Sequence, residues 1–166
     1  IDDAIRHSVT KMSHLHFVAA DQYRERVIQM GEPPDRVFTV GGLGVESANR
    51  SPRMSRTELE AVLGVALDDS VFLVTYNPAT LDPEASFLEL KEMLEAFKLL
   101  PGSQFIFSLP NADYGSRRIA RAIEEFCQET PNAFVFHSLG QVAYLSLMAQ
   151  AAGVVGNSSS GLLEAP

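Results

Sequence analysis

Residues 153–164, with the sequence GVVGNSSSGLLE, predict a short strand that passes through a turn of small residues into a helix. Val154 and Val155 form the apolar run, and Gly156 and three serines follow it. Small residues let the backbone approach a ligand closely, and serine hydroxyls together with the N–H groups of a starting helix can bind phosphate. Glu164 would lie on the first helical turn, where its carboxylate could accept hydrogen bonds from sugar hydroxyls. The alternative is that the serines only cap the helix.

The same strand-then-helix pattern occurs three more times before that turn. Apolar runs over residues 71–76, 104–109 and 133–137 are each followed by apolar residues at helical spacing. Near-continuous apolar strands are typical of a parallel sheet that is covered on both faces. Each strand with its helix takes roughly 20 to 35 residues, which is the size of a βαβ unit. The sequence therefore predicts an α/β fold with a doubly wound parallel sheet.

A glycine-rich and then polar stretch over residues 42–54 indicates a linker between two domains. Residues 1–41 alternate between helical and strand patterns, and residues 55–166 carry the repeated strand-then-helix units. Ser55 and Glu58 have the spacing of a capping box, which marks the first helix after the linker. We therefore expect the end of one domain, a linker and a second domain.

Composition and charge exclude several classes of protein. A hydrophobic share of 46% with 20% charged residues indicates a globular chain rather than a disordered one. The net charge of −8 argues against non-specific binding to nucleic acids or to anionic membranes. Cys127 is the only cysteine, so an internal disulfide or a multi-cysteine zinc site is impossible. Because no apolar run approaches the length of a membrane span and no signal peptide is evident, we expect a cytoplasmic protein.

Polar, turn-forming residues follow all four predicted strands of the second domain. They occupy residues 77–80, 110–116, 137–140 and 157–164. Ligands of parallel α/β sheets bind beyond the carboxyl ends of the strands. We therefore expect a nucleotide-sized ligand to lie across these four loops.

Two other kinds of site fit the residues less well. A serine hydrolase would need the pattern GxSxG, but Ser160 takes the place of the second glycine and no histidine follows His137. His14 and His16 lie two apart on a predicted strand and would face the same way, yet no third metal ligand is evident. A packed or hydrogen-bonded histidine explains one of them more simply.

Paired carboxylates are a third possibility. Asp2 and Asp3 are neighbours on a predicted helix, so their side chains point about 100° apart. One of them could enter a cleft as a general acid or base. Otherwise both are negative charges that the dipole favours at a helix N-terminus.

Four motifs in one order carry a resemblance to a known family. They are DDAIRHSVTKMSH over residues 2–14, LVTYNPATL over 73–81, PNADYGS over 110–116 and GNSSSGLLEAP over 156–166. Together they resemble the hydrolysing UDP-N-acetylglucosamine 2-epimerases of sialic acid and related nonulosonate biosynthesis. The resemblance implies the GT-B architecture, in which two Rossmann-like domains face a cleft. It also implies conversion of UDP-N-acetylglucosamine and water to N-acetylmannosamine and UDP, with no cofactor and no metal.

The resemblance also implies how the second domain would bind the nucleotide. Ser158 and Ser159 would hold the diphosphate, and Glu164 would hold the ribose hydroxyls. The backbone near Ser138 and Leu139 would contact the uracil.

Further roles are implied for residues outside the serine turn. Asp2 matches an acidic residue of the family that is assigned to acid–base work, its neighbour Asp3 is a further catalytic candidate, and Arg6 would steady that cluster. Asn111 would contact the nucleotide or the sugar. The family usually has histidine at the position of Asn77, and asparagine can donate a hydrogen bond to phosphate but cannot carry a proton.

Measured against the family, the sequence covers the tail of the first domain and most of the UDP-binding domain, so we expect it to be truncated at both ends. We expect these 166 residues alone to be catalytically inactive. The partner implied is a UDP-sugar, with neither nucleic acid nor membrane, and the full-length enzyme is expected to be a homo-oligomer. Two rival functions stay open, namely a GT-B glycosyltransferase and a non-catalytic UDP-sugar-binding module.

Overall fold

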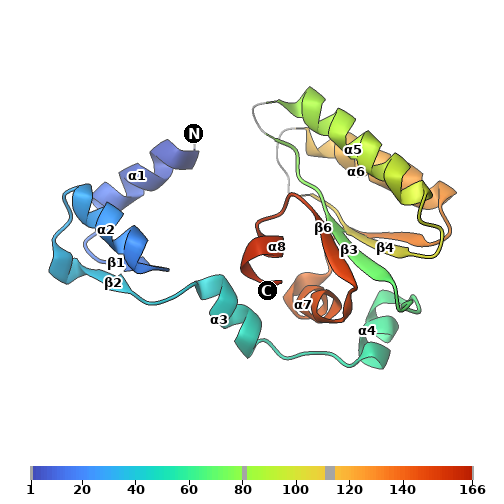
Figure 1. The fold of residues 1–166 in the computed structure, drawn as a ribbon, viewed down its shortest axis with the longest axis horizontal. Coiled ribbons are helices and arrows are strands. Elements are labelled where there is room, and N and C mark those ends of the chain that lie inside the picture. The colour runs from blue at the N-terminus through green and yellow to red at the C-terminus, as the bar shows by residue number, and fades with distance from the viewer. Residues whose placement is uncertain (1, 80–81, 111–114, 166) are drawn as a thin grey trace. The chain divides into compact units, whose positions relative to one another are not determined.

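The computed structural model describes residues 2–79, 82–110 and 115–165 of the chain (Figure 1). By its internal contacts the chain divides into two compact units, residues 1–50 and 51–166. The division falls within the stretch 42–54 that we expected to be a linker. Helix α3 (Leu43–Arg50) occupies much of that stretch, so it has regular structure of its own.

The first unit is built around two short parallel strands. β1 (His16–Val18) pairs with β2 (Val37–Thr39), and His16 lies opposite Val37 in the register. Parallel strands need a crossover connection, and helix α2 (Asp21–Gln29) with a 3-10 turn (Pro34–Arg36) supplies it. Helix α1 (Asp2–Met12) precedes β1, as the helical spacing at the start of the sequence predicts.

His16 is held by hydrogen bonding and is not paired with His14. His14 is exposed and precedes β1, so the expectation that both histidines lie on one strand face is wrong. His16 is buried, and its Nε2 lies 3.1 Å from Oε2 of Glu32. The other oxygen of Glu32 accepts a hydrogen bond from Nζ of Lys11 at 2.6 Å. The interpretation of a hydrogen-bonded histidine is confirmed for His16.

The second unit alternates helices and strands, as the sequence predicts. Ser55 caps the first helix, with its hydroxyl and the Glu58 carboxylate each bonded to the other's backbone N–H. The elements in chain order are α4 (Arg56–Leu63), β3 (Val71–Thr75), α5 (Pro83–Lys98), β4 (Gln104–Ser108), α6 (Ser116–Glu129), β5 (Ala133–Phe136), α7 (Gly140–Gln150), β6 (Gly153–Gly156) and α8 (Ser160–Leu163).

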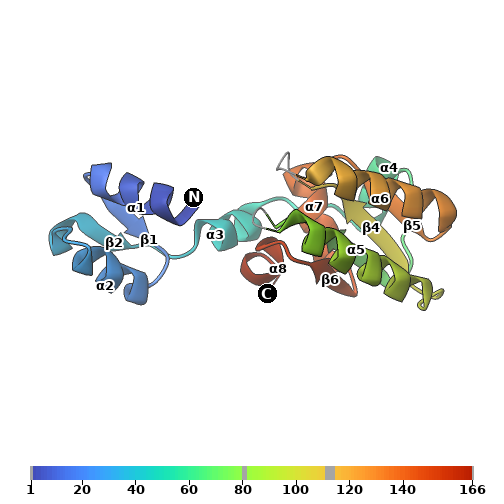
Figure 2. The same cartoon turned by 90° about the horizontal axis from the view of Figure 1, so that it is seen from above.

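These strands form one four-stranded sheet in the order β5-β4-β3-β6, and every neighbouring pair is parallel. Helices α5 and α6 lie side by side over one face, and α4 and α7 lie over the other (Figure 2 shows the same layers from above). The predicted doubly wound α/β fold is therefore confirmed.

Alternating residues of the strands supply the two buried faces of this sheet, as the period of two in a strand requires. Phe105 and Phe107 of β4 pack with the aromatic residues Phe97 of α5 and Phe126 of α6. Ile106, between the two phenylalanines, is equally buried and belongs to the opposite face. Both faces are covered, which explains why the strands are apolar along their whole length.

The strand order contains one reversal of direction. From β3 the chain moves outward through β4 to β5, and it then returns to place β6 on the free side of β3. The connections that leave β3 and β6 therefore turn to opposite faces of the sheet, which opens a crevice between their carboxyl ends. This switch point between β3 and β6 is where a ligand of such a fold binds.

Candidate functional site

Two asparagines join the loops that follow β3 and β6. The backbone N–H of Asn77 donates to Oδ1 of Asn157 at 2.8 Å, and Nδ2 of Asn157 donates to the carbonyl oxygen of Asn77 at 2.8 Å. The N–H of Asn157 also donates to the carbonyl of Thr75 at 3.3 Å. The two loops at the switch point are therefore tied directly to each other.

Gly156 allows the close approach of the two strands at this point. Its φ is +134°, and a Cβ built on it would lie 1.9 Å from the carbonyl oxygen of Thr75. No other residue type tolerates such a contact, since real Cβ atoms do not approach backbone oxygen so closely. The glycine before the serine turn is thus required by backbone packing.

The loop after β3 is also tied to helix α5. The N–H of Ala79 donates to Oγ of Ser86 at 2.9 Å. The hydroxyl of Tyr76 donates to the carbonyl of Ser86 at 3.0 Å and lies 2.8 Å from Oε2 of Glu89. Burial, together with the neighbouring Glu89 carboxylate, raises the pKa of Tyr76 to about 12.

This shift makes a prediction for alkaline solution. Because the pKa of Tyr76 is raised from 10.0 to about 12 in the folded protein, its contribution to stability is complete below pH 10 and is lost as the pH rises to 12. We expect the free energy of unfolding to fall more steeply over this window in the wild type than in Tyr76→Phe, which cannot ionise. Urea titrations at several pH values measure it. If the free energy of unfolding fell equally with pH in the two proteins, the raised pKa of Tyr76 would be contradicted.

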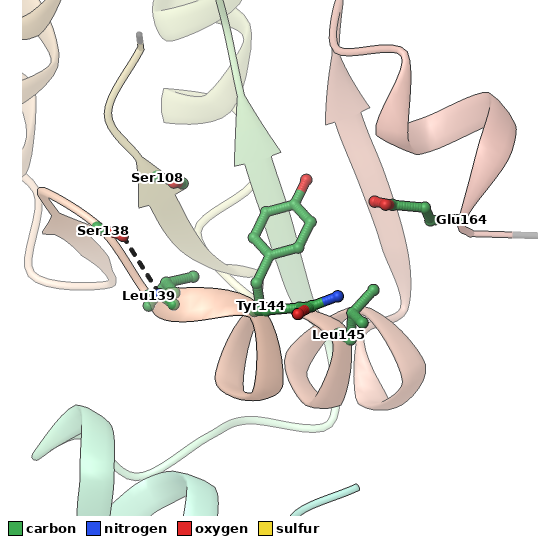
Figure 3. Close-up of a pocket in the computed structure, with 8 residues that line it drawn as sticks. Ser108, Ser138, Leu139, Tyr144, Leu145 and Glu164 are labelled. Carbon is green, nitrogen blue, oxygen red and sulfur yellow. Dashed lines mark hydrogen bonds between the residues drawn. The ribbon is translucent and has the colours of Figure 1, made fainter. Parts of the chain in front are cut away.

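A pocket of about 250 Å³ opens at the carboxyl ends of β4 and β5, beside α7 (Figure 3). Ser138 and Leu139 form its rim on the loop after β5, and Oγ of Ser138 accepts the N–H of Gly140 at 3.3 Å. Glu164 lies across from Tyr144 and points its carboxylate toward it (Figure 3). The full lining is Ser108, Ser138, Leu139, Gly140, Gln141, Tyr144, Leu145 and Glu164.

A second pocket, of about 480 Å³, surrounds the serine turn. Ser158 and Ser159 line it together with Asn157 and Thr75. The hydroxyl of Thr75 lies 3.4 Å from the hydroxyl of Tyr144, which lines the first pocket. The two pockets are therefore linked by a contact between polar side chains at the switch point.

Glu164 does not lie where the sequence pattern places it. Helix α8 spans only Ser160–Leu163, and Glu164 follows its last residue instead of occupying the first turn. The expected position is therefore wrong, because α8 ends at Leu163 after four residues and Glu164 is the residue at its C-terminal cap. The Glu164 carboxylate accepts the hydroxyl of Ser160 at 2.5 Å, which holds it beside the turn.

The serine hydroxyls are available for more than capping helix α8. Ser159 is the N-cap residue of α8, but its side chain makes no capping hydrogen bond. Oγ of Ser158 accepts the N–H of Ser160 at 3.3 Å. Since a serine hydroxyl can donate while it accepts, both Ser158 and Ser159 keep an O–H that can donate to a ligand in the second pocket.

The predicted catalytic residues belong to the first unit. Arg6 donates to Oδ1 of Asp3 at 2.5 Å, and Nε2 of His7 lies 3.7 Å from the same oxygen. All three side chains are exposed on α1. Asp2 starts this helix, but its side chain lies outside the described residues, as does the whole of Asn111.

The reasoning from sequence gave no individual role to Ser108, Tyr144 and Asn157, which line the two pockets, although Asn157 stands in one of the four predicted loops. Tyr144 carries a weak signal, because it is the one aromatic residue of helix α7. Asn157 stands in the serine motif, but nothing local indicates that its partner is Asn77. Ser108 is an ordinary strand-end residue and carries no signal.

Two features are absent from the described ranges 2–79, 82–110 and 115–165. No three histidine, cysteine, aspartate or glutamate side chains are grouped closely enough to hold a metal ion. No helix within those ranges is long and apolar enough to cross a membrane.

Solved structures of similar fold include two sugar-nucleotide epimerases. The UDP-GlcNAc 2-epimerase of Neisseria meningitidis bound to UDP-GlcNAc has a TM-score of 0.68 at 16% identity, over 90% of this chain and 41% of that one. The UDP-GlcNAc 2-epimerase of Methanocaldococcus jannaschii has a TM-score of 0.62 at 17% identity, over 94% of this chain and 44% of that one. These likenesses confirm the expected GT-B fold.

Relatives in sequence include a further sugar-nucleotide epimerase. The GDP/UDP-N,N'-diacetylbacillosamine 2-epimerase (hydrolyzing) of Campylobacter jejuni is 40% identical over all of this chain and 44% of its own length. The polysialic acid biosynthesis protein P7 of Escherichia coli is 39% identical over 99% of this chain and 42% of its own length. The chain thus spans less than half the length of these relatives. The family model described as UDP-N-acetylglucosamine 2-epimerase matches residues 1–166, and the chain belongs to this family.

Proposed function

We propose that the full-length protein is a hydrolysing 2-epimerase of UDP-N-acetylglucosamine or of a closely related UDP-sugar. The observation that supports this most is the serine turn at the switch point between β3 and β6, where Ser158 and Ser159 offer hydroxyls beside an acidic residue, Glu164. The name of the Campylobacter jejuni relative, which is 40% identical, supports the hydrolysing reaction.

In this proposal the second unit binds the nucleotide. Ser158 and Ser159 donate hydrogen bonds to the diphosphate, and Glu164 accepts them from the ribose hydroxyls. The backbone of Ser138 and Leu139, on the rim of the smaller pocket, contacts the uracil. A nucleoside diphosphate suits two neighbouring pockets better than one small anion does, because its base and its phosphates need separate places. In the same scheme residues 55–166 are the UDP-binding domain, and residues 1–41 are the end of the first domain.

The proposed reaction eliminates UDP from the sugar and then adds water. The bond between C1 of the sugar and the diphosphate oxygen breaks, UDP leaves with the electron pair, and C2 loses its proton to form a glycal. Water then adds its hydroxyl to C1, and C2 regains a proton on the opposite face, which gives N-acetylmannosamine. Asp2 and Asp3 are the proposed groups for these proton transfers, with Arg6 holding Asp3 in place. Asn77 and Asn111 would contact the phosphate or the sugar.

Titration of the full-length protein with UDP tests the binding site. Loss of two hydrogen bonds, each worth about 1 kcal/mol, should weaken the affinity of the double variant Ser158→Ala, Glu164→Ala about thirtyfold. The matched control is Ser103→Ala with Glu92→Ala, since Ser103 precedes β4 at the other end of the sheet and Glu92 is an exposed residue of α5. Calorimetry measures both. An unchanged affinity in the first double variant would remove Ser158 and Glu164 from the site.

Product analysis separates the rival functions. Release of free UDP with a sugar inverted at C2, followed by NMR, supports the epimerase, whereas transfer to an acceptor would indicate a glycosyltransferase. Binding of UDP by the full-length protein with no turnover would support a non-catalytic module. Inactivity of the 166 residues alone, a cytoplasmic location and assembly into homo-oligomers stay predictions.

A further inference from the structure

We infer that Asn157 is a positioning residue, whose carboxamide sets the place of the Asn77 loop relative to the Ser158 and Ser159 hydroxyls. The predicted effect of Asn157 on ligand affinity rests on the proposed function. The pairing between Asn157 and Asn77 rests on the geometry alone.

Both kinds of polar atom in the Asn157 side chain are used on the same partner. Oδ1 accepts the backbone N–H of Asn77, and Nδ2 donates to the carbonyl oxygen of Asn77, each at 2.8 Å. A carboxamide has the same donor and acceptor groups as a peptide bond. It can therefore take the place of a neighbouring strand residue, and here it does so across 80 residues of sequence.

The side chain extends the β3·β6 ladder beyond its end. The last pair of the ladder is Thr75 with Gly156, and the N–H of Asn157 still reaches the carbonyl of Thr75 at 3.3 Å. Beyond Thr75, the backbone N–H and carbonyl of Asn77 are the next groups that bond toward β6. Both form hydrogen bonds with the carboxamide of Asn157. Without this contact the two strands would separate beyond the bond from the Asn157 N–H to Thr75, where the serine turn bends away.

The loop of Asn77 is consequently held at both of its ends. Asn157 holds Asn77, and Oγ of Ser86 on α5 accepts the N–H of Ala79. On the other side, Ser158 follows Asn157 directly, so a shift of Asn157 moves the first serine of the turn. Loss of the carboxamide would therefore displace ligand-binding groups on both sides of the crevice while leaving every one of them present. Affinity for a diphosphate depends on such placement to within a fraction of an ångström.

Replacement of Asn157 by aspartate tests this pairing with almost no change in shape. An ionised carboxylate still accepts the N–H of Asn77, but its second oxygen faces the carbonyl oxygen of Asn77 and repels it. A protonated carboxyl has one O–H donor and one acceptor oxygen, so it restores both hydrogen bonds. Repulsion by the carbonyl raises the pKa of the introduced carboxyl in the folded protein, so the defect is present at neutral pH and is lost as the pH falls through that pKa.

The experiment measures UDP affinity and the thermal midpoint of the full-length protein at pH 7.5 and at about pH 5, which approaches the range where a raised aspartate pKa lies. For Asn157→Asp we expect about a tenfold loss of affinity relative to wild type at pH 7.5 and a loss of threefold or less at pH 5. The midpoint should recover in parallel. Asn157→Ala should lose affinity equally at both pH values, because alanine cannot regain either hydrogen bond. Asn49→Asp, the same change at an exposed position of α3, should match wild type throughout.

The outcomes distinguish failure of the proposed function from failure of the positioning role of Asn157. Wild-type protein that fails to bind UDP at either pH overturns the proposed function, while recovery of the midpoint in Asn157→Asp at low pH would still support the pairing. Wild-type binding together with an unchanged affinity of Asn157→Asp at pH 7.5 overturns the inference and leaves the proposed function standing. A loss of affinity in Asn157→Asp that is the same at both pH values also overturns it, because the hydrogen bonds to Asn77 would not then be the cause.

Discussion

Gly156→Ala is expected to lower the free energy of unfolding by about 3–5 kcal/mol, because the added Cβ forces the backbone to move. The backbone φ of +134° is strained for any residue with a Cβ, and the added Cβ would lie 1.9 Å from the carbonyl oxygen of Thr75. That oxygen belongs to the central strand and cannot retreat without breaking the β3·β6 ladder. Urea denaturation of the full-length protein measures the loss.

Gly64 and Gly102 serve as controls that separate the cost of a positive φ from the cost of the clash between the added Cβ and Thr75. An added Cβ at Gly64 meets no atom within 4 Å but would sit at a φ of +67°, so Gly64→Ala should cost about 1 kcal/mol. Gly102 has neither constraint, and Gly102→Ala should change stability by less than about 0.5 kcal/mol. If Gly156→Ala is no worse than Gly64→Ala, the close approach of β3 and β6 is not as the structure has it. The affinity for UDP should fall as well, because Asn157 and Ser158 directly follow the displaced residue.

Phe107→Ala should lower the free energy of unfolding by about 3–5 kcal/mol through the cavity that it leaves. The Phe107 side chain is fully buried. Its ring meets those of Phe97 and Phe126 edge to face, with centroids 6.1 and 5.9 Å apart. It therefore joins β4 to both α5 and α6, and neighbours fixed by two helices can close little of the cavity.

Leu88→Ala is the matched control for this change. Leu88 lies on α5 with 61% of its surface exposed, so its truncation removes little buried area, and alanine favours a helix at least as well. We expect a change of less than about 0.5 kcal/mol in the control. A loss of only 1 kcal/mol in Phe107→Ala would mean that α5 and α6 shift to fill the cavity. This face of the sheet would then be less tightly packed than described.

The local elements of the second unit were predictable because their signals are local. Ser55 and Glu58 form the capping box that the spacing predicts, and the apolar runs became parallel strands buried on both faces. The prediction that polar loops gather at one edge of the sheet follows from strand direction alone. In the same way, Ser138, Leu139 and Glu164 line one pocket, although the position of Glu164 on a helical turn was wrong.

The sequence by itself therefore determined the class of the fold, the strands and helices of the second unit and the edge of the sheet at which the polar loops follow the strands, because period and turn chemistry act within a few residues. Only the tertiary structure decided that β6 returns beside β3, since strand order depends on how the helices pack over both faces of the sheet. That order brings Asn157 to Asn77 across 80 residues, and it brings Tyr144 to Thr75 at the switch point. Contacts of this kind have no local pattern, because each partner satisfies its hydrogen bonds with a group that only the folded sheet places beside it.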